Sequence, residues 1–154
     1  MKVNEKNMQT IWFDNKSESV KIIDQTLLPF NLKIRDLRTF NDSVLAIKDM
    51  WVRGAPLIGV TAAYGMYLAS KENSSMEYLF KSGEILNKAR PTAVNLKWAI
   101  KKILEQIKTL ESYKISETIL NIANEIRQKD IDTCSKIGEN GLELLKSIYE
   151  QKKD

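Results

Sequence analysis

The fold is decided by one stretch of sequence, Arg53-Gly-Ala-Pro-Leu-Ile-Gly-Val-Thr-Ala-Ala-Tyr-Gly65. From Leu57 to Leu68 nearly every residue is apolar, and glycine and alanine recur along the run. A helix without a polar face is buried by its neighbours. A membrane span is excluded by length, because it needs about 20 consecutive apolar residues and Lys71 follows too soon. The stretch therefore predicts a central core helix.

The start of this helix is a candidate anion site. Pro56 suits the first turn, where its missing N–H would have no partner in any case. Gly54 and Ala55 leave the backbone uncovered, so free N–H groups and the positive end of the helix dipole face outward beside Arg53. This geometry suits a phosphate or a carboxylate. The alternative interpretation is that Arg53 is an ordinary surface residue and Gly54 only a turn.

A second arginine precedes a proline at Arg90-Pro-Thr92, and we expect Pro91 to start a helix that runs from about Thr92 to Leu110. If the two helix starts open into one hollow, Arg53 and Arg90 hold a phosphate from two sides through charge-assisted hydrogen bonds. Arg90 has the alternative interpretation of a solvated helix end. Asn95 either points into the same hollow or caps Thr92.

The chain before residue 38 predicts a small antiparallel sheet. Residues 9–14 and 19–24 are rich in β-branched and aromatic residues and are separated by Asn15-Lys-Ser17, which indicates a hairpin. Leu32, Ile34 and Leu37 suggest a third strand. Three strands with one apolar face are stable when helices cover them, whereas a lone hairpin is marginal in water.

Helices are expected from about residue 41 to 150. Asn41 or Asp42 caps the first helix, and Ser74 or Ser75 caps a later one that ends near Ala89. Further on, isoleucines at spacings of four, three and four predict an amphipathic helix that begins near Ile115 and is extended by apolar residues as far as Ile137. We expect an interruption at residues 138–141 and a last helix after it. The fold class is therefore α+β: one domain over residues 1–154, with a three-stranded antiparallel sheet followed by a helical bundle.

Composition excludes several classes of function. The 154 residues are 43% hydrophobic and 29% charged, which is typical of a globular domain. The net charge of +4 arises from lysines mixed with 20 acidic residues, so nucleic acid is not an expected partner. A single cysteine fits a reducing compartment. The first residues contain no apolar signal core, so the expected location is cytoplasmic, without a membrane partner.

The chain also lacks the residues of common catalytic centres. It has no histidine, which excludes His-based acid–base catalysis, Ser-His-Asp triads and histidine metal sites within it. One cysteine cannot build a zinc site. We interpret Cys134 as a small core residue rather than a catalytic thiol. The sequence offers groups that hold an anion without an evident base or nucleophile, and this predicts a substrate-holding module.

Two stretches, Trp51–Gly65 and Arg90-Pro-Thr-Ala-Val-Asn-Leu96, closely resemble methylthioribose-1-phosphate isomerases. Further matches are Thr10–Asp14, Leu27-Leu-Pro29 and Ile137–Leu145, so the resemblance spans almost the entire chain. The same superfamily includes ribose-1,5-bisphosphate isomerases and the regulatory subunits of initiation factor 2B. The pairing of Arg-Gly-Ala-Pro with Arg-Pro-Thr favours the methylthioribose enzyme.

The resemblance implies an aldose–ketose isomerase of methionine salvage that converts 5-methylthioribose 1-phosphate to 5-methylthioribulose 1-phosphate without a cofactor. Arg53, Gly54, Ala55 and Arg90 match the family's substrate-binding positions. The family's catalytic cysteine and aspartate belong to a second, Rossmann-like domain, which we expect this chain to lack. Cys134 does not match the catalytic cysteine's motif, so no catalytic residue is assigned here.

Two hypotheses follow from the sequence. In the first, the chain is the substrate-binding N-terminal half of the isomerase, inactive alone, and binds a phosphorylated pentose. In the second, it is a non-catalytic interaction or regulatory subunit that pairs with a separate C-terminal chain or with another protein. Complete enzymes of the family are typically dimers, so a homodimer is also expected.

Overall fold

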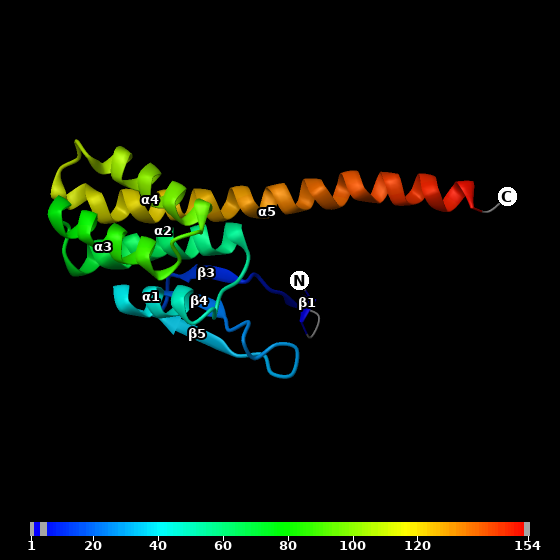
Figure 1. The fold of residues 1–154 in the computed structure, drawn as a ribbon, viewed down its shortest axis with the longest axis horizontal. Coiled ribbons are helices and arrows are strands. Elements are labelled where there is room, and N and C mark those ends of the chain that lie inside the picture. The colour runs from blue at the N-terminus through cyan, green and yellow to red at the C-terminus, as the bar shows by residue number, and fades with distance from the viewer. Residues whose placement is uncertain (1, 4–5, 153–154) are drawn as a thin grey trace.

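The computed structural model describes residues 2–3 and 6–152. Two short strands that the sequence did not indicate, β1 (Lys2–Val3) and β2 (Lys6–Asn7), pair antiparallel. A separate antiparallel sheet contains β3 (Ile11–Asp14), β4 (Ser19–Ile23) and β5 (Ile34–Leu37) in that order. The helices that follow are α1 (Phe40–Lys48), α2 (Ala55–Glu72), α3 (Met76–Ala89), α4 (Val94–Ile107) and α5 (Ser112–Gln151) (Figure 1). The α+β class is confirmed.

The three-stranded sheet forms where the sequence predicts it. The hairpin register pairs Ile11 with Ile22 and Asp14 with Ser19. At the turn, the Asp14 carboxylate accepts hydrogen bonds from the backbone N–H of Lys16 and the hydroxyl of Ser17, at 3.1 and 2.8 Å. Such bonds from a short polar side chain to the backbone favour a turn over a continued strand.

Helix α1 begins earlier than expected. Its N-cap is Thr39, not Asn41 or Asp42. The Thr39 hydroxyl accepts from the Asp42 N–H at 3.2 Å, and the Asp42 carboxylate accepts from the Thr39 N–H at 2.9 Å. This reciprocal capping box satisfies two free donors at once, which explains why Asp42 lies inside the first turn. Helix α3 begins as expected, because Ser75 caps it.

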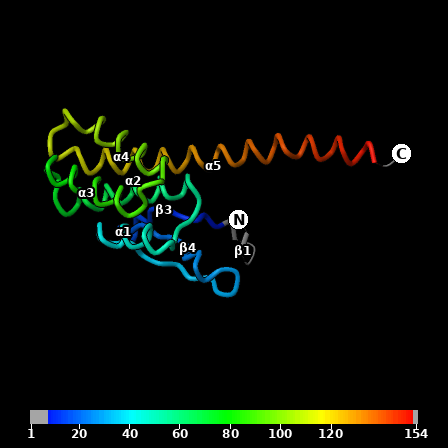
Figure 2. Tube along the Cα trace, in the orientation of Figure 1, coloured from blue at the N-terminus to red at the C-terminus, as the bar shows by residue number. Residues whose placement is uncertain are grey.

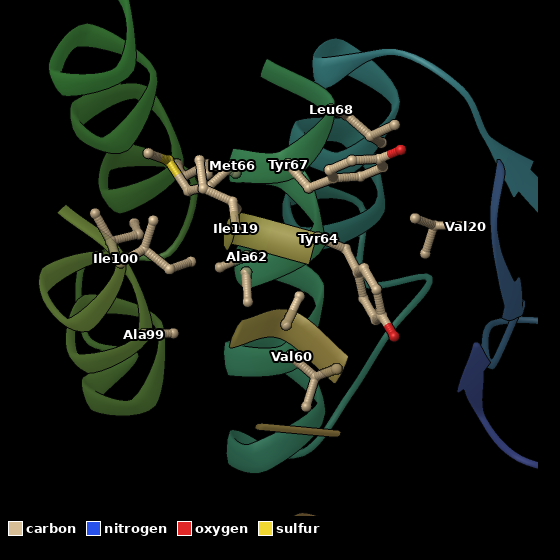
Figure 3. Packing of buried hydrophobic residues seen from close by; sticks show 14 of the residues in the cluster. Val20, Val60, Ala62, Tyr64, Met66, Tyr67, Leu68, Ala99, Ile100 and Ile119 are labelled. Atoms are coloured by element: carbon tan, nitrogen blue, oxygen red, sulfur yellow. The ribbon is translucent and has the colours of Figure 1, made fainter. Parts of the chain in front are cut away.

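Helix α2 lies at the centre of the body and confirms the expectation of a core helix. Every residue from Leu57 to Ser70 is buried. Tyr64 and Tyr67 point toward the sheet, and Met66 points toward the side where α4 carries Ile100 (Figure 3). The Tyr67 ring meets Phe13 of β3 edge to face, with centroids 5.5 Å apart. Such edge-to-face contacts stabilise aromatic pairs beyond their buried area.

Helix α5 is continuous, and the predicted interruption at residues 138–141 is wrong. Both glycines there remain helical, because glycine costs only about 1 kcal/mol in a helix interior and neither adopts the positive φ that ends a helix. The proximal half packs on the body through Ile115, Ile119, Ile122, Ala123 and Ile126. The distal half, Arg127–Gln151, begins beside the body, where Lys129 and Thr133 line a hollow with α2 and α4, and its later turns extend beyond the other helices (Figure 2). Among the described residues, no helix is both long and apolar enough to cross a membrane.

Candidate anion-binding site

The start of α2 has the features of an anion site. Gly54 is the N-cap, with φ of 90°, and Pro56 lies in the first turn, as the sequence predicts. Within residues 2–3 and 6–152 no side chain caps this end, and the first turn contains no acidic residue. Arg53, Gly54 and Ala55 are all exposed. The free N–H groups and the helix dipole therefore face solvent beside a guanidinium, which favours an anion.

The start of α4 differs from the expectation. Arg90 caps the C-terminal end of α3, and the N–H of Ala93 donates to the Arg90 carbonyl at 3.0 Å. This turn contains Pro91, so α4 begins only at Val94, with Ala93 as an N-cap that makes no side-chain bond. The prediction that Pro91 starts the helix is wrong, because residues 90–93, which include Pro91, form a turn that precedes the helix. The second helix start is nevertheless also uncapped.

The N-terminal parts of α2 and α4 contact each other. A Cβ placed on Gly59 would stand 3.0 Å from the carbonyl oxygen of Asn95 and 3.2 Å from its Cβ. Only glycine permits this approach without a shift of the neighbouring backbone. The two uncapped helix starts therefore lie at the same end of the body.

A hollow of about 200 Å³ lies beside this contact. Residues of three helices line it: Pro56, Gly59 and Val60 of α2, Asn95 and Trp98 of α4, and Ile126, Lys129, Asp130 and Thr133 of α5. Asn95 lines this hollow, and its predicted orientation toward a hollow shared with Arg53 and Arg90 stays a prediction. Neither Arg53 nor Arg90 lines this space. Arg53 is exposed and Arg90 half-buried, and in the described part of the chain neither guanidinium has a hydrogen bond or an ion pair. Their assignment to one phosphate stays a prediction.

Sequence analysis missed Lys129 and Asp130. They follow Ile126 by three and four residues, so they continue the buried stripe of α5 with charged side chains. The signal is the position of two charged residues where the apolar spacing of the helix face would continue, and in the structure Lys129 is exposed and Asp130 half-buried.

A second hollow, of about 290 Å³, lies between α5 and the start of β3, and Cys134 lines it. Cys134 is exposed, so the interpretation as a core residue is wrong. Nearby, Arg127 donates to Gln9, and the buried Tyr64 hydroxyl donates to Asn124 at 2.7 Å. Burial raises the pKa of Tyr64 to about 12. Within the described ranges no group of three or more His, Cys, Asp or Glu residues is arranged to hold a metal ion.

The loop before α2 is tied to the sheet. The carbonyl of Trp51 accepts from the N–H of Gln25 at 2.9 Å. The guanidinium of Arg35 lies over the Trp51 ring, 4.1 Å from its centroid, and its Nε is 2.6 Å from the carboxylate of Asp24. Burial alone would raise the pKa of Asp24, but the hydrogen bonds from Thr26 and Arg35 outweigh it, so the pKa lies below its ordinary value.

Comparison with known proteins gives consistent matches. The model of the initiation factor 2 subunit family matches residues 51–150. The methylthioribose-1-phosphate isomerase of Sinorhizobium medicae is 43% identical over 153 residues, which are 99% of this chain and 42% of that relative. The enzyme of the same name from Escherichia coli is 39% identical, and the match covers 99% of this chain and 41% of the enzyme. The chain thus spans about 42% of the length of the relatives it matches.

Two solved structures share the fold. The 5-methylthioribose 1-phosphate isomerase of Pyrococcus horikoshii superposes with a TM-score of 0.73 at 34% identity, covering 80% of this chain and 37% of the enzyme. The delta subunit of translation initiation factor eIF-2B from A. fulgidus gives a TM-score of 0.74 at 32% identity, covering 81% of this chain and 38% of the subunit.

Proposed function

The chain belongs to the initiation factor 2 subunit family, and from this membership we propose that it is the N-terminal, substrate-binding part of an aldose–ketose isomerase acting on 5-methylthioribose 1-phosphate. Residues 1–154 form the domain that holds the sugar phosphate. A second, Rossmann-like domain supplies the acid and base that move a proton between C1 and C2. This chain alone is inactive in the proposal, and it works in the cytoplasm.

The observation that carries the proposal is the contact between Gly59 and Asn95, which brings two uncapped helix starts to one end of the body. In the proposal, the guanidinium of Arg53 and the N–H groups of Gly54 and Ala55 bind the phosphate, and Arg90 binds it from the side of α4. Bonds from charged donors to phosphate are shorter and stronger than neutral ones. The absence of histidine from the sequence supports the assignment of proton transfer to another segment.

Calorimetric titration tests the binding site. We expect 5-methylthioribose 1-phosphate to bind the chain, and Arg53→Ala to weaken binding about 10- to 100-fold, since a hydrogen bond to a charged group contributes about 1.5–3 kcal/mol. Arg90→Ala should have a similar effect. The matched control is Lys97→Ala, which removes an exposed cation in α4. Equal binding by Arg53→Ala and the control would refute the assignment.

NMR detection of ketose formation tests the activity. We expect no turnover of 5-methylthioribose 1-phosphate by this chain alone, because it has neither the catalytic cysteine nor the catalytic aspartate of the family. Addition of the remaining segment of the Sinorhizobium medicae relative should restore turnover if the two parts assemble. Turnover by the chain alone would contradict the proposal.

A second candidate function is that of an interaction subunit, favoured by the distal half of α5. Its exposed apolar side chains include Ile137, Leu144 and Leu145, which are 66, 67 and 66% exposed. Together with Gly141 and Ile148 they lie within one half of the helix circumference, at the 3.6-residue period of a face that packs against protein. We propose that this face binds a polypeptide equivalent to the part of the relatives that the chain does not span.

Co-purification with that segment of the Sinorhizobium medicae relative tests the second candidate. We expect a stable complex, and we expect Leu144→Glu with Leu145→Glu to abolish it. Glu143→Lys, on the polar face, is the control and should leave the complex intact. A symmetric dimer of this chain in sedimentation, without binding to the segment, would instead assign the face to a second copy.

A further inference from the structure

A fully buried carboxylate lies at the end of β4. The Asp24 side chain has no exposed surface and accepts three hydrogen bonds, from the N–H of Thr26 at 3.0 Å, the hydroxyl of Thr26 at 2.6 Å and Nε of Arg35 at 2.6 Å. Because a buried charge is costly unless it is paired, this arrangement fixes the position of the Arg35 guanidinium.

The same guanidinium is stacked on the loop that leads to α2. Its carbon lies 4.1 Å from the centroid of Trp51, and the Gln25 N–H donates to the Trp51 carbonyl at 2.9 Å. Trp51 precedes Arg53 by only two residues. One side-chain contact and one backbone bond therefore tie the candidate anion site to the sheet, from a segment that is 16 or more residues earlier in the chain.

Gly54 in this loop has φ of 90°, which glycine adopts freely. Met50, which leads into the loop, has φ of 58° and needs such ties, because this conformation is unfavourable for a residue other than glycine. A non-glycine residue in the left-handed region costs about 1 kcal/mol or more and persists only where its surroundings hold it. Besides the contacts to Trp51, a hydrogen bond of 3.3 Å from the Val52 N–H to the Ala46 carbonyl holds this segment.

We propose that Arg35 is a positioning residue for the anion site: held by Asp24 and stacked on Trp51, it keeps the loop of residues 51–54 in the conformation that presents Arg53 and the first N–H groups of α2. The inference rests on the proposed function for its ligand. The order that Arg35 gives to the loop of residues 51–54 can be measured without any ligand.

A nearby ion pair provides the comparison. Lys21 is paired with Asp36 across β4 and β5 at 2.6 Å, the same separation as in the Arg35–Asp24 pair. Asp36 is 37% exposed, however, and among the described residues Lys21 makes its ion pairs only with Asp36 and Asp14. Loss of Lys21 therefore removes a similar ion pair from the sheet without touching the loop.

The test uses Arg35→Lys, Arg35→Ala and the control Lys21→Ala in the full chain. Lysine keeps the charge beside Asp24 but lacks the planar group that stacks on an aromatic ring. We expect Arg35→Lys to lower the melting temperature by only a few degrees, because one native contact is lost while the charge beside Asp24 remains. Amide exchange at Gln25 and Val52 should become about 3- to 30-fold faster, the range of one lost cation–π contact. Binding of 5-methylthioribose 1-phosphate should weaken by a similar factor, and Arg35→Ala should exceed both effects.

The outcomes separate the inference from the proposed function. If the parent chain binds the sugar phosphate and Arg35→Lys binds it equally well, the positioning role is overturned and the proposed function stands. If the parent chain does not bind it, the proposed function fails, and amide exchange alone decides whether Arg35 orders the loop. Unchanged exchange at Gln25 and Val52 in Arg35→Lys, or equal acceleration in Lys21→Ala, overturns the inference.

Discussion

Helix α2 and the distal half of α5 are both rich in apolar residues and both contain two glycines, yet their surroundings are opposite. A Cβ at Gly59 or Gly65 of α2 would stand 3.0 Å from a neighbouring residue, whereas no described residue beyond the helix itself lies within 4 Å of a Cβ at Gly138 or Gly141. The glycines of α2 are thus required by packing within this chain. Those of α5 serve no packing within it, which is expected of a face that meets another polypeptide.

The largest difference between the two regions should appear on truncation of an apolar side chain. Met66 of α2 is completely buried, so Met66→Ala should lower the free energy of unfolding by about 2–5 kcal/mol. Leu144→Ala in α5 should change it by less than about 0.5 kcal/mol, because its side chain is 67% exposed. Urea denaturation measures both. Similar losses in the two variants would mean that the distal half is packed in solution.

Alkaline pH should destabilise the core around α2. Burial raises the pKa of Tyr64 to about 12, so the folded state holds this proton more tightly than the unfolded chain, whose tyrosines have an ordinary pKa near 10. The stabilisation is complete below pH 10 and is lost as the pH rises toward 12, and it amounts to about 2–3 kcal/mol. The measurement is the difference in unfolding free energy between the parent chain and Tyr64→Phe across this window. An identical pH dependence of the two would contradict the assignment.

Replacement of a glycine by alanine should affect stability differently in α2 and in the distal half of α5. Gly65→Ala places a Cβ 3.0 Å from the Cβ of Ser43, so α1 and α2 must separate slightly. We expect a loss of about 1–3 kcal/mol, typical of an overpacked core. Thermal melts of Gly65→Ala and of the matched variant Gly141→Ala provide the comparison. A loss in Gly141→Ala as large as in Gly65→Ala would remove the distinction.

The smallest expected effect is a gain. Gly138→Ala should stabilise the distal helix by up to about 1 kcal/mol, because alanine loses less backbone entropy than glycine and has open space around it here. Helical content from circular dichroism during a melt measures this gain. In the proposed complex with the remaining segment of the Sinorhizobium medicae relative, the same substitution should weaken association if a partner backbone approaches closely at residue 138. A decrease in helicity of the isolated variant would contradict the helix as described.

Much of the fold could be predicted because its signals are local. Turn residues between two runs of β-branched and aromatic residues located the hairpin, and the unbroken apolar run located α2. The N-cap of α1 was predicted two to three residues too late, because Thr39 and Asp42 cap the helix together as a reciprocal pair. The break predicted at residues 138–141 failed because a glycine weakens a helix but ends it only when a competing conformation is favoured.

The site was predicted less completely. The local pattern located the uncapped start of α2 and the position of Pro56, but Pro91 proved to lie in a turn before α4. Lys129, Asp130 and Trp98 reach the hollow from helices that are distant in sequence. No local pattern contains that information.

The sequence by itself determined the segments of the three-stranded sheet, the helix that is buried, and the uncapped start of that helix beside Arg53, because each depends on residues within a few positions of one another. Only the tertiary structure decided that Gly59 meets Asn95, that Arg35 stacks on Trp51, and that the distal half of α5 leaves the body. These depend on how separate elements pack, and packing is set by the fit of whole surfaces rather than by any one stretch of residues.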